Sequence, residues 1–347
     1  MTVKVDILQA DEIPKVAAFV RENPEASFFH LPEWKSVIER AFGHRVPYLV
    51  ARRGGAVEGV MPLVHVKSRL FGNALISNAF CVRGGAVAAS EEARKALDAK
   101  ALQVFDEVQA EYLEVRSPVV RHSADEGWLA REDLYFNFSR AIEPSEEACL
   151  KQIPRKQRAV VRKALTDPTL TTTLDTTVDD FFRLYAFSVR NHGTPVFAKK
   201  YVRLLREAFG PACEVLTIRK DGAPVASVLS FLFRDTVLPY YTGGTFEARK
   251  LGANDLMYWH VMRRAADQGL TQFDFGRSKA GTGPFSFKKN WGFTPEPIVH
   301  EFLMAGGADL PNLNPTNPKY ALFIKAWKRL PLPLANAVGP HIVRNIG

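Results

Sequence analysis

The sequence has few cysteines and no long apolar run, and each absence excludes a class of protein. Its 347 residues include three cysteines, Cys81, Cys149 and Cys213, which lie far apart and form no CxxC pair. A disulfide framework or a cysteine-bound zinc site is therefore not expected. No stretch of about 18 apolar residues is present, which argues against a transmembrane helix. The charged N-terminus lacks the apolar core of a signal peptide, so we expect a cytoplasmic protein.

The sequence also lacks the spacing of His, Asp and Glu residues that is typical of metal ligands. No metal site is therefore expected.

Positive charge is in excess, because the chain has 46 Lys and Arg but only 37 Asp and Glu, which gives a formal net charge of +9. Such a field favours anionic partners, from nucleic acid to nucleotide sugars or an anionic membrane, without choosing among them. The length predicts roughly two domains.

One order of elements occurs twice along the chain. The first copy is expected to hold two hairpin strands, a third strand, a helix and a closing strand, at 46–53, 56–66, 70–80, 91–111 and 112–117. The second copy follows the same order, at 214–219, 224–234, 236–241, 255–268 and 272–276. Asp221-Gly222 between two apolar runs is a strong hairpin signal. A helix between two strands makes the closing strand parallel to an earlier one, so the sequence predicts an α/β fold with a mixed sheet.

The repeat divides the chain into domains. We predict a first domain over 1–145, a second over 146–305 and a C-terminal amphipathic tail over 306–347. A linker is expected near 140–180. Within it, the basic stretch 155–163 predicts a helix whose cationic side is either solvated or a binding face.

The tail combines apolar and basic residues. It begins at Asn314-Pro315-Thr316-Asn317-Pro318, and a helix over about 320–328 carries Phe323, Ile324 and Trp327 beside Lys325. A basic amphipathic helix can lie on a membrane surface. Packing on its own domain is the more common outcome for such a helix and is the favoured interpretation.

Glycine-rich turns mark a candidate site in the second copy. Tyr240, Tyr241, Gly243 and Gly244 end a central strand before the crossover helix, where glycine lets a ligand approach the backbone closely. The following segment, Arg249–Asn254, leads two cations into a helix N-terminus, which favours anion binding. A simple turn with a helix cap is the alternative.

The residues after the closing strand extend this candidate site. Asp274 lies between two phenylalanines in a covered strand, so its carboxylate needs a partner such as Arg277 or is poised for proton transfer; the partner is favoured. Gly281–Gly283 predicts a mobile loop. Lys288 and Lys289 are candidates to hold a phosphate or carboxylate, with a solvated basic turn as the alternative.

A polar segment, Arg190–Pro195, follows the helix expected over 179–190 and can reach the same cleft. His192 within it is a candidate base near neutral pH. A lone loop histidine is more often structural, and that alternative stays open.

These motifs together resemble the FemAB family, most of all its branch associated with PEP-CTERM and exopolysaccharide gene clusters. The residues that carry the likeness are Arg190–Pro195, Tyr240–Gly244, Asn254–Trp259, Phe273–Ser278 and Phe287–Phe293, with Phe29-His30, Trp34, Phe42–His44 and Gly84-Gly85 in the first half. Arg249 and Gly252 also match the acyl-CoA pyrophosphate motif of GNAT acetyltransferases, although Asn254 stands where Gly or Ala is usual. The resemblance implies two tandem GNAT-like domains.

The resemblance also implies an activity. Well-known members pass an amino acid from aminoacyl-tRNA to an amine of a UDP- or lipid-linked peptidoglycan precursor. Lys288 and Lys289 match the family's segment near the donor site, Tyr240, Tyr241 and Gly243 match its turn, and Arg190 becomes a candidate for acceptor phosphates. The long charged helical arm of some members is missing here, which weakens the inference of tRNA and points to a polysaccharide-cluster acceptor.

We therefore expect an acyl or aminoacyl transferase acting on a cell-envelope or exopolysaccharide precursor. The predicted catalytic residues are Tyr241, Lys288, Asp274 and His192. The predicted substrate-binding residues are Arg190, Tyr240, Gly243, Gly244, Asn254, Arg277, Ser278, Thr282, Lys289 and Trp291. No cofactor is expected beyond the acyl donor, aminoacyl-tRNA or acyl-CoA, as co-substrate. Expected partners are a nucleotide- or lipid-linked saccharide precursor, tRNA and the inner membrane surface, but no DNA. The alternatives are an acetyl-CoA-dependent N-acetyltransferase and a non-catalytic polysaccharide-associated protein.

Overall fold

The structure, a computed structural model, describes residues 2–69, 71–307 and 318–346. Its contacts divide the chain into two compact units. The first unit is drawn from Met1–Leu134, Pro297–Leu313 and Val343–Gly347, and the second from Tyr135–Glu296 and Asn314–Ile342. The expected start of the tail, Asn314–Asn317, lies outside the described residues. The expected domain boundary at residue 145 stays a prediction.

The first unit is built on a mixed sheet in the order β1-β2-β3-β4-β6-β14, with β5 paired to β3. Its strands are β1 (Lys4–Ile7), β2 (Tyr48–Arg53), β3 (Ala56–Ser68), β4 (Gly72–Ser77), β5 (Val87–Ala88), β6 (Tyr112–Ser117) and β14 (Pro295–Met304). Its helices are α1 (Ile13–Glu22), α2 (Glu33–Phe42) and α3 (Glu91–Glu107). β4 and β6 run parallel on either side of the α3 crossover, which confirms the predicted direction of the closing strand.

The second unit repeats this plan in the order β7-β12-β11-β10-β9-β8, and β13 pairs with β7. Its strands are β7 (Trp128–Ala141, of which the part from Tyr135 onward lies in this unit), β8 (Leu170–Leu174), β9 (Cys213–Lys220), β10 (Ala223–Phe233), β11 (Thr236–Gly244), β12 (Gln272–Asp274) and β13 (Ser278–Lys279). Its helices are α4 (Glu146–Gln152), α5 (Arg155–Leu165), α6 (Asp179–His192), α7 (Lys199–Phe209), α8 (Phe246–Leu251), α9 (Ala253–Asp267), α10 (Gly283–Asn290), α11 (Pro318–Trp327) and α12 (Leu332–Val343).

The hairpin predicted between β9 and β10 is present. Asp221 and Gly222 both have positive φ, 48° and 82°, as the two central residues of a type I′ turn require. β11 and β12 are parallel across the α9 crossover. The sequence signals for this part of the second unit are thus confirmed.

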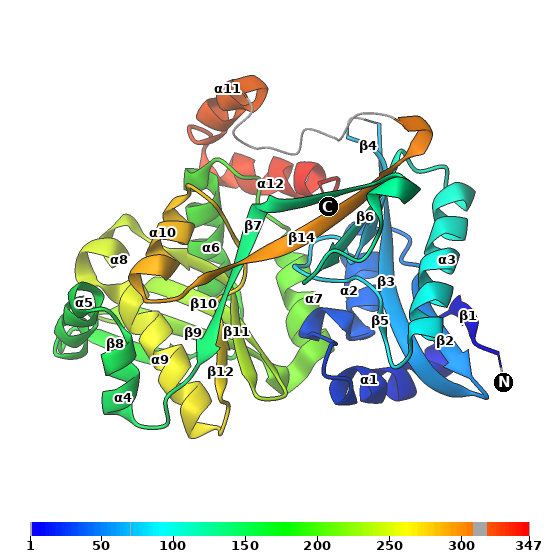
Figure 1. The fold of residues 1–347 in the computed structure, drawn as a ribbon. Coiled ribbons are helices and arrows are strands. Elements are labelled where there is room, and N and C mark those ends of the chain that lie inside the picture. The colour runs from blue at the N-terminus through cyan, green and yellow to red at the C-terminus, as the bar shows by residue number, and fades with distance from the viewer. Residues whose placement is uncertain (1, 70, 308–317, 347) are drawn as a thin grey trace. The chain divides into compact units, whose positions relative to one another are not determined.

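Helices cover both faces of the second sheet, with α6 and α7 on one face and α9 on the other (Figure 1). The core on the α9 face includes Met257, Trp259 and Met262 of α9, all buried. Successive side chains of a strand point to opposite faces. Which face a β11 residue points to therefore decides which helices it can contact.

The segment 140–180, expected to hold a linker, contributes elements to the second unit. It forms the end of β7, helices α4 and α5, and β8 at one edge of the sheet. Cys149, Ile153 and Val161 are completely buried in the core. The basic helix expected at 155–163 exists as α5, and its apolar side packs on α9 because Val161 and Ala164 recur at helical spacing.

Candidate functional site

A β-bulge lies in the middle of β11, at Tyr240, within the segment where the site was expected. Along β10, Leu229 is paired with Tyr241 and the next residue, Ser230, with Pro239. Tyr240 therefore has no residue opposite it. A bulge of this kind re-aims side chains, and the rings of Tyr240 and Tyr241 lie only 4.7 Å apart, centroid to centroid.

Tyr241 points toward α6 and α7, into a cluster of aromatic residues. Its hydroxyl lies 3.0 Å from that of Tyr201, and its ring contacts Tyr185 and Phe197 edge-on. Burial raises the pKa of Tyr241 well above its ordinary value. The phenol therefore stays protonated at neutral pH, so the predicted catalytic Tyr241 is a hydrogen-bonding group of this cluster and not a proton acceptor.

Gly243 is needed for packing between β11 and α6, which corrects its expected role. A Cβ added there would lie 2.2 Å from the backbone nitrogen of Tyr185. The space that glycine frees is filled by the α6 backbone and not by a ligand. Ser188 of α6 also holds β11 close to this helix, since its Oγ accepts a hydrogen bond from the Gly244 nitrogen at 3.3 Å.

The anion site expected at the start of the crossover helix is also corrected. α9 begins just after Gly252, where a Cβ would lie 2.9 Å from Cγ1 of Val160 on α5. Gln157 of α5 donates to Asp255 in the first turn of α9. A carboxylate of the chain and a packed helix thus occupy the N-terminus that was expected to bind an anion. The side chain of Asn254 turns toward Gly244, with Oδ1 3.1 Å from the position of an added Cβ.

Lys288 is the most unusual of the predicted site residues. It lies on α10 and is only 8% exposed. Its Nζ donates to the backbone oxygens of Gly276 at 2.9 Å and Arg277 at 3.0 Å. The rings of Phe138 and Phe275 flank the ammonium at 5.4 and 5.6 Å. Burial, with a contribution from Arg277, lowers the pKa of Lys288 to about 7, and Asp274 opposes this shift.

Three predicted residues, Asp274, Arg277 and Ser278, lie in or directly beside the loop that Lys288 holds, which joins β12 to β13. Asp274 accepts from the backbone nitrogen of Gly276 at 2.8 Å, so its partner is a loop amide and not the expected Arg277. The guanidinium of Arg277 lies over the ring of Tyr135 at 4.7 Å. Ser278 is 6% exposed, and its Oγ has no hydrogen-bond partner among the described residues.

The remaining residues of this segment have structural roles. Thr282 caps the N-terminus of α10, with Oγ1 accepting from the Phe285 nitrogen at 3.4 Å. Lys289 is exposed and lies over the ring of Phe285. Trp291 is fully buried, so it supports the site from behind and does not line it.

Sequence reasoning missed a buried polar group on α9. Asp255 is 7% exposed and accepts from Trp291 Nε1 at 2.8 Å. Burial raises its pKa above the ordinary value, against the effect of its hydrogen bonds. One turn later, the hydroxyl of Tyr258 is hydrogen-bonded to Thr242 of β11, and its ring contacts Phe275 at 4.6 Å. Asp255 and Tyr258 are three residues apart on a predicted helix, and this spacing, which places both side chains on one face, was the signal that could have indicated them.

The four predicted catalytic residues are therefore not brought together. Asp274 and Lys288 are electrostatic neighbours around one loop. Tyr241 points to the α6 face, whereas its neighbour Thr242 contacts Tyr258 on the α9 face, where Phe275 and Lys288 lie. His192 is the exposed last residue of α6. Arg190 donates to the backbone oxygen of Lys328 at 3.0 Å, so it contacts the tail helix and not the Lys288 loop. The single glycine-lined cleft expected from the sequence is replaced by two separate clusters.

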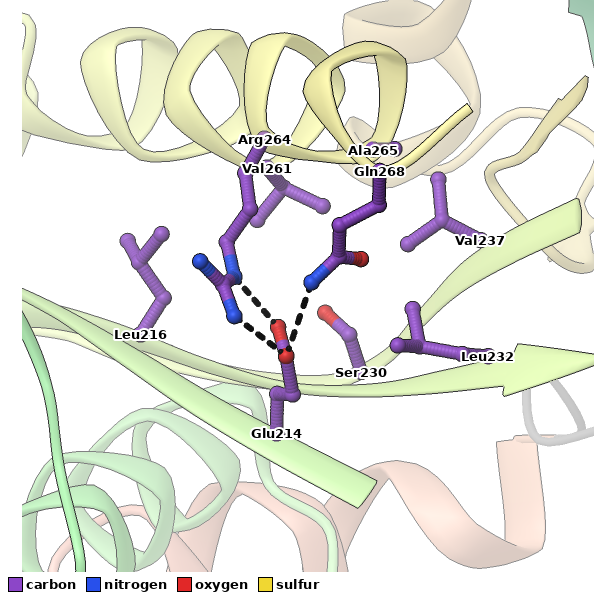
Figure 2. Close-up of a pocket in the computed structure, with 9 residues that line it drawn as sticks. All are labelled: Glu214, Leu216, Ser230, Leu232, Val237, Val261, Arg264, Ala265 and Gln268. Atoms are coloured by element: carbon purple, nitrogen blue, oxygen red, sulfur yellow. Dashed lines mark hydrogen bonds and ion pairs between the residues drawn. The ribbon is translucent and has the colours of Figure 1, made fainter. Parts of the chain in front are cut away.

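Two cavities lie elsewhere, between α9 and the sheet. Figure 2 shows the first, where Glu214 accepts from Arg264 and Gln268. Its volume of about 10 Å³ leaves room for about one water. The second is an open depression of about 440 Å³ between β8 and α9. None of the predicted site residues lines either of them.

The parallel strands β11 and β12 separate close to the Lys288 loop. They pair only at Thr236–Gln272 and Val237–Phe273, and the part of β11 that follows, up to Gly244, pairs with β10 alone. The backbone on this side of β11 thus has no strand partner among the described residues. A separated strand pair of this kind offers free backbone groups to an extended ligand.

Comparison with known proteins identifies this architecture. The family described as Acetyltransferase (GNAT) domain matches residues 150–289. The fold is GNAT-like. No curated protein matches the chain in sequence, so structural likeness carries the comparison further. FemX aligns with a TM-score of 0.70 at 16% identity, over 92% of this chain and 100% of that one.

Two further solved structures share the GNAT-like fold. The C-terminal domain of a putative lysylphosphatidylglycerol synthetase from Agrobacterium fabrum aligns with a TM-score of 0.58 at 14% identity, over 85% of this chain and 92% of that one. A tandem GNAT protein from the clavulanic acid biosynthesis pathway aligns with a TM-score of 0.51 at 16% identity, over 88% and 100%. These likenesses confirm the mixed α/β class and the tandem GNAT-like arrangement predicted from the sequence.

Across residues 2–69, 71–307 and 318–346, no group of three or more His, Cys, Asp or Glu side chains is placed to hold a metal ion. In the same ranges, no helix is long and apolar enough to span a membrane.

Proposed function

We propose that the second unit is an acyl or aminoacyl transferase and that the loop held by Lys288 is its reaction centre. The observation that carries this proposal is a buried ammonium whose two described hydrogen bonds go to backbone oxygens and whose side chain forms no described ion pair. Burial of a cation in this way costs stability. Such costs are concentrated at functional sites.

In the proposed reaction, an amine or hydroxyl of the acceptor attacks the carbonyl carbon of a thioester or ester donor. A new C–N or C–O bond forms, the donor C–S or C–O bond breaks, and the acceptor proton passes to the leaving thiol or hydroxyl. The ammonium of Lys288 has a third hydrogen to donate to the developing oxyanion. The free Oγ of Ser278, one residue beyond a carbonyl that Lys288 contacts, is a second donor.

The donor is proposed to lie along the unpaired side of β11, where that strand has separated from β12. The acceptor is proposed to be a cell-envelope precursor, an assignment supported by the likeness to FemX and to the lysylphosphatidylglycerol synthetase domain. The finer proposal, taken from the sequence motifs, is a nucleotide- or lipid-linked saccharide of exopolysaccharide synthesis. Aminoacyl-tRNA and acyl-CoA both remain candidate donors.

The test measures donor binding and turnover in the whole protein. Calorimetry with acetyl-CoA, charged tRNA and UDP-sugars identifies the donor and acceptor classes, and mass spectrometry of co-purifying ligands supports the choice. With the donor in hand, Lys288→Met should lower kcat by about 100- to 1000-fold, the usual effect of losing one oxyanion donor. Lys200→Met, an exposed change on α7, is the matched control and should keep wild-type kcat.

The pH profile separates this role from general-base catalysis. With the pKa of Lys288 near 7, an ammonium donor makes the rate fall as pH rises through 7, and Lys288→Arg should shift this fall to higher pH. A rate that increases through pH 7 and is lost in Lys288→Arg would indicate a neutral lysine base instead. Wild-type kcat in Lys288→Met would remove Lys288 from the mechanism.

Two alternatives have their own outcomes. Binding of acetyl-CoA with release of its thiol, without any response to tRNA, indicates a plain N-acetyltransferase. Binding of a saccharide precursor without any donor indicates a non-catalytic protein on a GNAT-like scaffold, since a fold alone does not determine activity.

A further inference from the structure

The last segment of the chain has an unusual charge pattern. From Leu310 to Gly347 it contains no Asp or Glu, but it contains five Lys or Arg residues. The described part of it in the second unit forms α11 and α12 (Figure 1). A cationic segment without Asp or Glu attracts anions and has no acidic side chains of its own to neutralise it.

The inner sides of these helices pack on the second unit. Trp327 of α11 is 3% exposed and donates from Nε1 to the backbone oxygen of Thr194 at 3.1 Å. Ile324 lies against Gly193 at the end of α6. On α12, Ala335 is buried and Gly339 lies against Val196. The packing expected for the tail helix is thus present, and it fixes which side of each helix faces outward.

The outer sides carry large apolar residues in the open. On α11, Leu322 is 78% exposed and Phe323 is 41% exposed. On α12, Leu334 and Val338 are 48% and 39% exposed, and their spacing of four residues places them on one stripe. Exposed apolar residues gathered on one surface mark an interaction site more often than single ones do.

Cations lie beside this apolar surface. Lys325, Lys328 and Arg329 are exposed, and none of their side chains forms an ion pair with a described residue. Arg190 of α6 approaches the same helix end, and its Nε is buried without a hydrogen-bond partner among the described residues. The outward side of α11 and the residues that follow it therefore combine apolar side chains with uncompensated positive charge.

We propose that the outer surface of α11 and α12 docks on a membrane surface that contains anionic lipids. Leu322, Phe323, Leu334 and Val338 would enter the boundary between headgroups and acyl chains, while Lys325 and Arg329 contact lipid phosphates, as interfacial amphipathic helices do. The exposed aliphatic side chains favour lipid over RNA, because RNA is bound through charge, hydrogen bonds and stacking on aromatic rings. This proposal stands independently of the proposed acyl transfer.

The test is co-sedimentation of the whole protein with vesicles. Vesicles of phosphatidylglycerol and phosphatidylcholine in equal parts should bind the protein, and vesicles of phosphatidylcholine alone should bind it at least tenfold less. Each cation near an anionic surface contributes about 1 kcal/mol, so Lys325→Gln with Arg329→Gln should weaken binding roughly 25-fold. Leu322→Ser with Phe323→Ser should weaken it at least tenfold at unchanged charge.

The matched control makes the same charge change on the other basic helix. Lys156→Gln with Arg162→Gln removes two exposed cations of α5 and should change vesicle binding less than twofold. A second measurement uses Phe323→Trp, whose emission should shift to the blue and be quenched by brominated lipid. Circular dichroism of each variant checks that the fold is retained.

Three outcomes would overturn the proposal. One is equal binding to the two kinds of vesicle. Another is an α5 variant that loses as much binding as the α11 variant. The third is loss, in the α11 variants, of binding to a single-stranded RNA while vesicles stay unbound, which would assign the surface to nucleic acid.

Discussion

β6 of the first unit ends in Arg116-Ser117, and in the second unit Arg277-Ser278 follows β12. In the first unit, the Arg116 Nε donates to Glu114 at 2.7 Å, and Nη1 donates to the backbone oxygen of Cys81 at 2.9 Å. The Ser117 Oγ donates to the backbone oxygen of Val119 at 2.6 Å. In the second unit, Arg277 lies over a tyrosine ring and forms no described ion pair, and the Ser278 Oγ has no described partner.

The two copies also differ in how they treat buried charge. Burial alone would raise the pKa of Glu114, but Arg116 and His300 outweigh it and hold the pKa well below its usual range. Lys288, a buried lysine of the second unit, has no carboxylate within hydrogen-bonding distance among the described residues, and its pKa falls to about 7. The same order of elements thus holds a buried ion pair, Glu114–Arg116, in one copy, and in the other a buried lysine that forms no ion pair with a described residue. The copy without the ion pair is the one in which the Lys288 ammonium keeps a hydrogen to donate to a substrate.

The largest expected effect tests the paired copy. Glu114→Gln leaves the buried guanidinium of Arg116 without its counter-charge, and breaking a buried pair in this way costs about 3–5 kcal/mol of unfolding free energy. Urea unfolding measures the loss, and hydrogen exchange should localise it to the first unit. Glu132→Gln, an exposed change on β7, should stay within about 0.5 kcal/mol of wild type. Equal losses in both variants would contradict the assigned pairing.

A smaller effect tests the cation of the second unit through the pH dependence of stability. Unfolded Lys288 keeps its proton up to about pH 10.4, whereas the folded side chain loses it near pH 7. Between these values the unfolded state binds more protons, so the unfolding free energy should rise with pH. Relative to Lys288→Met, we expect a rise on the order of 2–4 kcal/mol from pH 7 to pH 10. If the unfolding free energies of wild type and Lys288→Met changed equally with pH, the pKa of Lys288 would not be lowered in the folded protein.

The smallest effect compares the two serines directly. Ser117→Ala removes a hydrogen bond in the paired copy and should cost about 1 kcal/mol. Ser278→Ala removes a hydroxyl without a described partner and should change the unfolding free energy by less than about 0.5 kcal/mol. Thermal unfolding of the two variants under one condition measures both values. If Ser278→Ala were the more damaging change, the proposed free donor would be a structural one.

Much of the fold could be predicted because its signals are local. The positive φ values of Asp221 and Gly222 follow from the dipeptide itself, and the parallel closing strands follow from the helix that precedes each of them. The ends of elements were less predictable. α3 stops at Glu107 and not at residue 111, because Gln109 takes a left-handed backbone conformation. Glycine is the usual sequence signal for such a helix end, and the residue here is a glutamine.

The site was predicted only in part, because its geometry depends on contacts between distant segments. Lys288 and Asp274 do lie around one loop. Tyr241 was separated from them by a bulge at Tyr240, which sequence periodicity does not reveal. Asp255 was missed because its partners Gln157 and Trp291 come from α5 and the C-terminal cap of α10, far away along the chain.

By itself, the sequence determined the repeated order of strands and helices, the hairpin turn, the basic helix α5 and the acid-free tail. Each of these depends on backbone preferences or on charge within a few neighbouring residues. Only the tertiary structure decided that the missing side chain of Gly243 makes room for the backbone of α6. It also decided that Lys288 is buried and donates to two backbone carbonyls. Burial and pairing arise from segments that meet in space, and the pKa of a group follows the solvent and charges that surround it there.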